Sequence, residues 1–216
     1  MNILITAGAT VEYIDNIRFI TNISTGRTAS TIADLLKDKS SITYLYSKTV
    51  KYMPSKNKKI RFIEFSDFKS LNNILRDELK KNHYDIIIHS AAVSDFSVKE
   101  IISGHRRYKA PFNGKIKSDG DINLILIKNF KIIDRIREYS KNKKIVIIGF
   151  KLTSTNNKHK RLDMISDVKS DIVVHNDINE ISEKNHIFNL YSNSKIICSV
   201  NNEKELAEAL RKIIFV

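Results

Sequence analysis

Cysteine is almost absent from this sequence, and long apolar runs are missing from it. The single cysteine, Cys198, cannot form a disulfide within the chain, and its apolar flanks in KIICSV favour a buried small side chain over a nucleophile. No run approaches the roughly 18 uninterrupted apolar residues of a membrane-spanning helix. The start, MNILITAGAT, has no positive segment before an apolar stretch and no secretory cleavage signature. We therefore expect a soluble, cytoplasmic protein with no membrane partner.

Acidic residues are outnumbered, with 24 Asp and Glu against 37 Lys and Arg, which gives a formal charge of +13. Such a surplus can mark a nucleic-acid-binding surface. However, the positive residues are spread through 56–59, 80–81 and 141–144, and no segment interleaves basic with aromatic residues. A solvated basic surface is favoured over a nucleic-acid site, and an anionic small molecule remains an attractive ligand.

Short apolar runs rich in β-formers alternate along the chain with segments of helical spacing. Strands are predicted at 2–7, 41–46, 60–65, 84–92, 122–127, 144–150 and 170–177, and helices at 28–36, 68–79, 130–139 and 158–168. A hairpin of 186–191 and 195–200 and a last helix from near Asn202 complete the chain. The alternation predicts a Rossmann-like α/β fold, a mostly parallel sheet with helices on both faces, plus the C-terminal β-hairpin.

One segment, residues 96–120, breaks this rhythm. It is polar and basic and contains Gly104, Pro111 and Gly114, which indicates a long, mobile flap loop. No repeat or low-complexity linker divides the chain, and its 216 residues, 42% of them hydrophobic, can bury a real core. We therefore expect a single domain over 1–216.

The stretch TAGATVEYIDNIRFITNISTG, residues 6–26, is too long for an ordinary turn between a strand and a helix. A dinucleotide fingerprint would need about three glycines and an acidic residue after the second strand, but Gly8 stands alone. Ser24, Thr25 and Gly26 directly precede a predicted helix, where hydroxyl and main-chain N–H groups can receive a phosphate. The alternative is that Ser24 or Thr25 merely caps that helix.

These residues resemble the motif ITAGGTxExIDxVRxIxNxSSG of phosphopantothenate-cysteine ligase. The resemblance continues in order, because HSAAVSDF is similar to AAVADY, KIKS to KIKK, IKNFKII to VKNPDIV, IIGFK to VGF and DIVVHND to a strand ending in AND. It runs from Thr6 to Asp177. The GFK variant and the long segment before KIK most resemble the separate, single-function bacterial form of the ligase.

The resemblance implies an enzyme of coenzyme A biosynthesis that joins 4'-phosphopantothenate to L-cysteine. The carboxylate would attack the α-phosphate of a nucleoside triphosphate, usually CTP in bacteria with ATP as the alternative, and Mg²⁺ would offset the charge repulsion. The cysteine amine would then attack the acyl nucleotide. Two other classes stay open, namely a short-chain oxidoreductase that binds NAD(P) and a non-catalytic nucleotide-binding protein.

The same resemblance assigns site residues. It implies catalytic roles for Asn22, which would act on the acyl nucleotide, for Lys115 on a closing flap, and for Asp95, which would also hold the metal. Nucleotide contacts are implied for Gly8, Ser24, Thr25, Gly26, His89, Ser90, Ala91, Lys117, Asn129, Phe130, Lys131, Ile132 and Phe150. Asn176 is a candidate substrate contact. The family also implies a homodimer in which the flap completes the neighbouring site, and it allows a separate decarboxylase as a partner.

Several positions depart from the family pattern. Ala9 replaces the second glycine of GGT, Arg27 replaces a lysine, and Ser118 ends the KIKK motif. Phe130-Lys131 replaces Pro-Asp. Met164 and Val168 occupy positions where the family helix after VGF carries lysines, while Arg161 and Lys169 lie nearby in the sequence. These changes leave the nucleotide contacts of that helix, and the choice between CTP and ATP, open.

Overall fold

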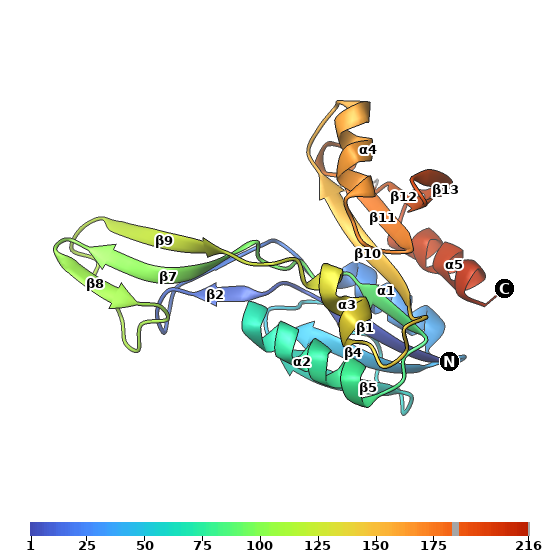
Figure 1. The fold of residues 1–216 in the computed structure, drawn as a ribbon, viewed down its shortest axis with the longest axis horizontal. Coiled ribbons are helices and arrows are strands. Elements are labelled where there is room, and N and C mark those ends of the chain that lie inside the picture. The colour runs from blue at the N-terminus through green and yellow to red at the C-terminus, as the bar shows by residue number, and fades with distance from the viewer. Residues whose placement is uncertain (183–185, 216) are drawn as a thin grey trace.

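The computed structural model describes residues 1–182 and 186–215 and has an eight-stranded sheet at its centre (Figure 1). The strands follow the order β13-β12-β11-β10-β6-β1-β4-β5. Their bounds are β1 (Asn2–Ala7), β4 (Ser41–Ser47), β5 (Ile60–Phe65), β6 (Ile86–His89), β10 (Val146–Thr153), β11 (Ile172–Asp177), β12 (Phe188–Ser192) and β13 (Lys195–Val200). The first six are parallel and the last two form the antiparallel hairpin, so the predicted fold class is confirmed.

Helices cover both faces of this sheet because its central strands alternate their buried side chains between the faces. On β1, Ile3 and Ile5 pack toward α1 (Arg27–Leu36) and α5 (Glu203–Ile214), and Leu4 packs toward α2 (Phe68–Lys81). A short helix, α3 (Ile136–Tyr139), follows the 3-10 turn Ile132–Arg135 on the α2 face, while α4 (Lys158–Ser166) projects beside β10 (Figure 1). None of the helices within the described ranges is long and apolar enough to span a membrane.

The C-terminal hairpin carries the only cysteine of the chain. Cys198 on β13 is half-buried against the core, as its apolar flanks predict, and burial raises the pKa of its thiol. A raised pKa keeps the thiol protonated and unreactive near neutral pH. The structure therefore agrees with a packing role for Cys198.

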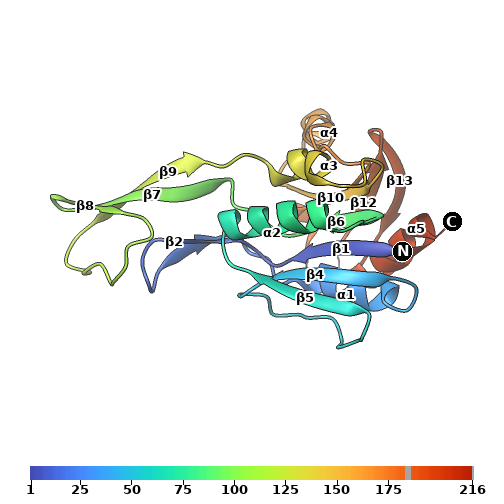
Figure 2. The same cartoon turned by 60° about the horizontal axis from the view of Figure 1, so that its bottom comes forward.

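A second, three-stranded antiparallel sheet extends from the body, and we call residues 96–128 the arm (Figures 1 and 2). It consists of β7 (Phe96–Ser103), β8 (Arg106–Lys109) and β9 (Ile122–Lys128), in the order β8-β7-β9. The prediction of a loop over 96–120 is thus wrong up to Lys109. The strand predicted at 122–127 exists, but it pairs with β7 and not with the central sheet. Both faces of the arm are largely exposed, so its sequence lacks the alternation that reveals a strand packed on a core.

The long opening segment forms a second extension. Strands β2 (Val11–Tyr13) and β3 (Phe19–Thr21) make an antiparallel hairpin that runs along the arm (Figure 2). Asp15 in the hairpin turn is buried, and its carboxylate accepts hydrogen bonds from the main-chain nitrogens of Ile17, Arg18 and Ile116 and forms an ion pair with Arg18. The delay before α1 therefore reflects an inserted hairpin that Asp15 fastens to the arm.

Candidate functional site

The site lies where the chain order reverses in the central sheet. Strand β1 is followed through α1 by β4 on one side, while β6 lies on its other side, and ligands of open α/β sheets bind at such a switch point. The segments leaving β1 and β6 stay together: the nitrogen of Ala92 donates to the oxygen of Gly8 at 2.8 Å, and the nitrogen of Thr10 donates to the oxygen of Ala92 at 3.2 Å. The two loops that the sequence analysis singled out therefore form one surface.

The turn after β1 depends on Gly8 and tolerates Ala9. Gly8 has φ +82°, and a Cβ atom there would lie 2.2 Å from Oγ of Ser47. The nitrogen of Ala9 donates to the same oxygen at 3.2 Å. Within 1–182 and 186–215, the only non-glycine residues with positive φ are Asn193 and Ser194. Ala9 therefore needs no glycine-like backbone, and its departure from the family pattern is compatible with this turn.

The predicted phosphate segment lies at the start of α1. Gly26, with φ +79°, is the N-cap, and no side chain makes a capping bond there; Oγ1 of Thr25 is 3.4 Å from the nitrogen of Arg27. Thr25 therefore accepts one N–H at the helix start, that of Arg27, as the capping alternative expects in part. The next main-chain N–H groups of the first turn, those of Thr28 and Ala29, are left for an anion at the positive end of a ten-residue helix.

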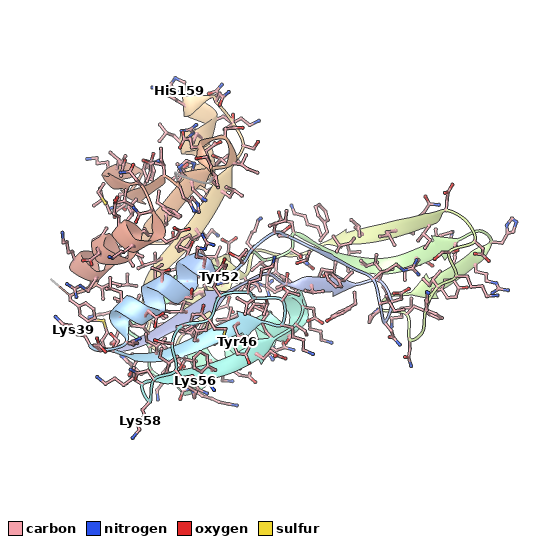
Figure 3. The ribbon with its side chains drawn as sticks, turned by 180° about the vertical axis from the view of Figure 1, so that it is seen from behind. Lys39, Tyr46, Tyr52, Lys56, Lys58 and His159 are labelled. Carbon is pink, nitrogen blue, oxygen red and sulfur yellow. The ribbon has the colours of Figure 1, made fainter. Side chains whose placement is uncertain are left out.

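The chain from β4 to β5 covers this helix start. The oxygen of Thr25 accepts hydrogen bonds from the nitrogens of Lys51 and Tyr52, at 3.0 and 3.1 Å. The guanidinium of Arg27 lies 4.5 Å from the ring centre of Tyr52, which is labelled in Figure 3, and donates to the Tyr52 hydroxyl at 2.6 Å. This contact gives Arg27 a fixed geometry that the family lysine would not have.

The structure brings Asn22, Asp95 and Asn129 together around the loop after β6. Nδ2 of Asn22 donates to the oxygen of Val93 at 3.3 Å. The nitrogen of Asn129 donates to the oxygen of Asp95 at 2.8 Å, and the ammonium of Lys131 pairs with the Asp95 carboxylate. Three segments far apart in the sequence thus meet at the loop 93–95, with Asn22 bonded to Val93 and Asn129 and Lys131 bonded to Asp95.

Beneath this surface lies a network that the sequence analysis missed. Ser94 and Thr10 exchange hydrogen bonds at 2.9 and 3.0 Å. The buried carboxylate of Glu12 accepts a hydrogen bond from Ser97 at 2.7 Å, and Nδ2 of Asn129 donates to Ser97 at 2.9 Å. Two signs were available in the sequence: Glu12 matches the glutamate of the family motif, and it is an acidic residue inside the otherwise apolar VEY strand, where a buried charge needs nearby donors.

His89 ends β6 and is buried. Its Nδ1 lies 3.0 Å from Oγ1 of Thr6, which also accepts from the nitrogen of Ala91 at 3.1 Å. The Thr6 hydroxyl thus links the His89 ring to the main chain of the loop after β6. Burial lowers the pKa of His89 to about 4, so the ring is neutral at pH 7 and offers no positive charge to a phosphate. Ser90 is half-buried beside it.

Residues 129–132 differ in what they can offer a ligand. Phe130 packs edge-on to Phe68, with ring centres 5.0 Å apart, and Ile132 is buried in the core on the α2 face. Only the main chain of Ile132 can therefore reach a ligand, whereas the side chains of Asn129 and Lys131 lie at the surface of the site.

Lys115 and Lys117 lie elsewhere, on the irregular part of the arm. Both are exposed and flank the buried Ile116, which is tied to Asp15 in the β2–β3 turn. Asn22 follows the opposite end of that hairpin, roughly 10 Å or more away at the rise of about 3.3 Å per strand residue. Within one chain, the structure does not join these lysines to Asn22 and Asp95.

Phe150 and Asn176 lie on β10 and β11, on the far side of β6 from β1. Phe150 is half-buried against the core, and Nδ2 of Asn176 is 2.9 Å from Nε2 of His186. Arg161 on α4 pairs with Glu180 at 3.1 Å and with the buried Asp177 at 3.6 Å. Arg161 is thus occupied inside the protein and does not replace the missing family lysines.

The donor set bears on the expected metal. No group of three or more His, Cys, Asp or Glu side chains able to hold a metal ion occurs among the described residues. Mg²⁺ in nucleotide sites commonly takes one or two carboxylates and completes its shell with phosphate and water. The Asp95 carboxylate fits the role of a single protein ligand for Mg²⁺, and in this structure it is paired with Lys131.

Comparison with known proteins agrees with this architecture. The family described as the DNA/pantothenate metabolism flavoprotein C-terminal domain matches residues 1–215. The coenzyme A biosynthesis bifunctional protein CoaBC of Thermococcus kodakarensis is 34% identical over 192 residues, which cover 86% of this chain and 43% of that protein. The chain spans about half or less of the length of the curated CoaBC proteins that it matches.

Solved structures share the fold. The DNA/pantothenate metabolism flavoprotein from Streptococcus pneumoniae has a TM-score of 0.85 at 28% identity, over 99% of this chain and 98% of that one. A mutant of Cab2 in complex with phosphopantothenate-cysteine has a TM-score of 0.73 at 18% identity, over 98% of this chain and 85% of that one.

Proposed function

The chain belongs to the family of the DNA/pantothenate metabolism flavoprotein C-terminal domain, and we propose that it is a ligase that joins 4'-phosphopantothenate to L-cysteine at the expense of a nucleoside triphosphate. The observation that carries this proposal is the meeting of Asn22, Asp95 and Asn129 at the switch point, beside the open start of α1. The names of the similar proteins, among them CoaBC and a complex with phosphopantothenate-cysteine, support the same reaction.

The proposed reaction has two steps. First, the carboxylate of phosphopantothenate attacks the α-phosphate, and pyrophosphate leaves as the acyl nucleotide forms. The amine of cysteine then attacks the acyl carbon, which releases the nucleoside monophosphate and forms the amide. The triphosphate and the carboxylate are both anionic, so most of the catalytic work is to hold them together and stabilise the charge that builds on the leaving group.

Each part of the site has a proposed task in this reaction. The start of α1, with Ser24, Thr25 and Gly26 before it, receives phosphate oxygens through the N–H groups of its first turn that follow Arg27. The Asn22 amide holds the acyl nucleotide, because an amide can donate to the acyl oxygen and accept from the incoming amine. Asp95 contacts the Mg²⁺ that accompanies the triphosphate, and Lys131 moves from Asp95 to a phosphate. We propose CTP as the nucleotide.

We further propose that the active form is a homodimer. Large apolar side chains are exposed along β3 and the arm: Phe19, Ile20, Ile23, Phe96, Ile125, Leu126 and Ile127. Ile23 is fully exposed at 100%, which is unusual for an apolar residue next to a functional amide. These side chains alternate between the two faces of their strands, so a second copy that embraces the arm would cover them and bring its own Lys115 and Lys117 to the site.

The test is a reconstitution with purified protein. Phosphopantothenate, cysteine, Mg²⁺ and each nucleoside triphosphate in turn are supplied, and pyrophosphate and the amide product are followed. We expect pyrophosphate release that requires both phosphopantothenate and the nucleotide, with the highest rate for CTP. Tight binding of NADPH, seen by fluorescence, without any pyrophosphate release would instead favour an oxidoreductase.

A further inference from the structure

Glu12 is a buried carboxylate for which the proposed reaction has no role. It lies on β2 with 6% of its surface exposed. Its Oε1 accepts a hydrogen bond from the nitrogen of Phe68, at the start of α2, at 3.0 Å, and its Oε2 accepts from Oγ of Ser97 at 2.7 Å. Burial raises the pKa of Glu12, while the hydrogen bonds from Ser97 and Phe68 oppose that rise. A carboxylate kept in this position needs a reason beyond packing.

The Ser97 hydroxyl has one proton and three neighbours. Its oxygen is 2.7 Å from Oε2 of Glu12, 3.1 Å from Oδ1 of Asn129 and 2.9 Å from Nδ2 of Asn129. Hydrogen bonds to a charged acceptor are shorter and stronger than those to a neutral one, so the proton goes to Glu12. The serine oxygen can then only accept, and the group that it accepts from is Nδ2 of Asn129.

The second proton on Nδ2 of Asn129 goes to the oxygen of Ser94 at 3.0 Å. Both donors of the amide are thereby used inside the protein. Its oxygen, Oδ1, keeps its lone pairs for another donor. The main chain of Asn129 is in turn hydrogen-bonded to Asp95, so this orientation is set at the candidate site itself.

We propose that Glu12 is a positioning residue that, through Ser97, fixes the Asn129 amide with its oxygen directed to a donor group of the nucleotide. The inference rests on the proposed function in taking the ligand to be a nucleotide. The donor would be an N–H or O–H of the base or ribose, because phosphate oxygens at neutral pH only accept.

The test begins with Glu12→Gln. The introduced glutamine accepts from Phe68 with its oxygen and donates to Ser97 with its amide, so Ser97 must turn its proton to Oδ1 of Asn129, 3.1 Å away, and that oxygen then accepts inside the protein instead of from the nucleotide. We expect the side-chain ¹⁵N–H₂ resonances of Asn129, assigned by their loss in Asn129→Ala, to shift. In steady-state kinetics, KM for the nucleotide should rise about tenfold while kcat changes little, as for a lost binding contact.

A double-mutant cycle separates positioning from general damage. If Glu12 acts through Asn129, Glu12→Gln should have no further effect on the nucleotide KM in the Asn129→Ala background. The idea is overturned if the two effects on KM multiply, or if the Asn129 amide resonances do not move. The matched control is Glu78→Gln, which alters another half-buried glutamate, paired with Arg61 at the opposite end of α2, and should leave KM unchanged.

Two other outcomes are a Glu12→Gln protein that does not fold and a wild-type protein without pyrophosphate release. Should Glu12→Gln fail to fold, Ser97→Ala is the second variant. It keeps the bond from Phe68 to Glu12 and removes the hydroxyl that bonds both Glu12 and Asn129, so the Asn129 resonances should again shift and the double-mutant cycle with Asn129→Ala applies in the same way. Should the wild-type protein release no pyrophosphate with any nucleotide, the proposed function fails. The ¹⁵N–H₂ measurement, which needs no substrate, then decides by itself whether Glu12 orients Asn129.

Discussion

A Cβ atom placed on Gly8 would lie 2.2 Å from Oγ of Ser47, so the end of β4 rests directly on the turn that follows β1. Gly8→Ala should therefore suffer both backbone strain at φ +82° and a steric overlap, with a cost of about 2 to 5 kcal/mol in the free energy of unfolding. Denaturant unfolding followed by circular dichroism measures this loss.

Gly104→Ala is the matched control for that substitution. Gly104 also has positive φ, at +57°, but nothing lies within 4 Å of its Cβ position. Only the backbone strain remains for Gly104→Ala, so we expect its free energy of unfolding to fall by about 1 kcal/mol. Replacing Ser47 by alanine in the Gly8→Ala protein should restore part of the stability. Equal losses for the two glycines would show that the contact with Ser47 has no energetic weight.

Asn22→Asp should separate the two proposed chemical steps. Asn22 is exposed, and the only described hydrogen bond of its side chain is to the oxygen of Val93, so the substitution should fold normally. An aspartate cannot donate to the acyl oxygen, and we expect the acyl nucleotide to form while amide formation slows by about 10² or more. Quenched reactions analysed by mass spectrometry should show the accumulating intermediate. Wild-type turnover by this variant, with Asn123→Asp on the arm as control, would remove Asn22 from the mechanism.

The central sheet could be predicted because its strands are buried on both faces and its helices carry strong apolar stripes. Ile86, Ile87 and Ile88 read as a central strand from composition alone, and the last helix begins directly after Asn202, as predicted. Strands β7 and β8 of the arm could not be predicted, since residues such as Lys99 and Arg107 on them face solvent and hide the strand pattern.

The candidate site was predictable only where a motif carried it. Asn22, Asp95 and Asn129 entered through family resemblance, and the hydrogen bonds of the loops around β6 unite them. The glutamate of the motif marks Glu12, but its contact with Ser97 was missed because it depends on the β2–β3 hairpin lying beside β7, and no local pattern encodes such a long-range contact.

Stability should fall in acid, in two stages. Burial holds the pKa of His89 near 4, below the usual value of about 6.5, so the native state resists its protonation. The contribution of neutral His89 to the free energy of unfolding is complete above about pH 6.5 and is lost as pH falls toward 4. The Arg18 guanidinium holds the pKa of Asp15 well below its usual range, so the contribution of Asp15 is lost only below about pH 4.

The second stage can be assigned by substitution. Asp15→Asn removes the ion pair to Arg18, so it should lower the melting temperature by several degrees at pH 7 and flatten the decline below pH 4. Asp77→Asn is the control, because Asp77 lies on the surface 3.7 Å from Arg76 with both side chains more than half exposed. If Asp15→Asn and the wild type lost stability in parallel below pH 4, the attachment of the β2–β3 hairpin to the arm would not depend on the charge of Asp15.

Subunit mixing tests whether Lys115 acts on a neighbouring chain. Lys115→Ala should lose activity because it removes a cation from the triphosphate, whereas Lys56→Ala, on the loop before β5 (Figure 3), should not. In a mixture of Lys115→Ala and Asn22→Asp proteins, half of the dimers pair the two variants, and each such dimer has one site with both wild-type residues. The mixture should therefore recover about a quarter of wild-type activity after subunit exchange. If Lys115 instead served its own chain, no mixed dimer would contain an intact site, and activity would stay at the level of the separate variants.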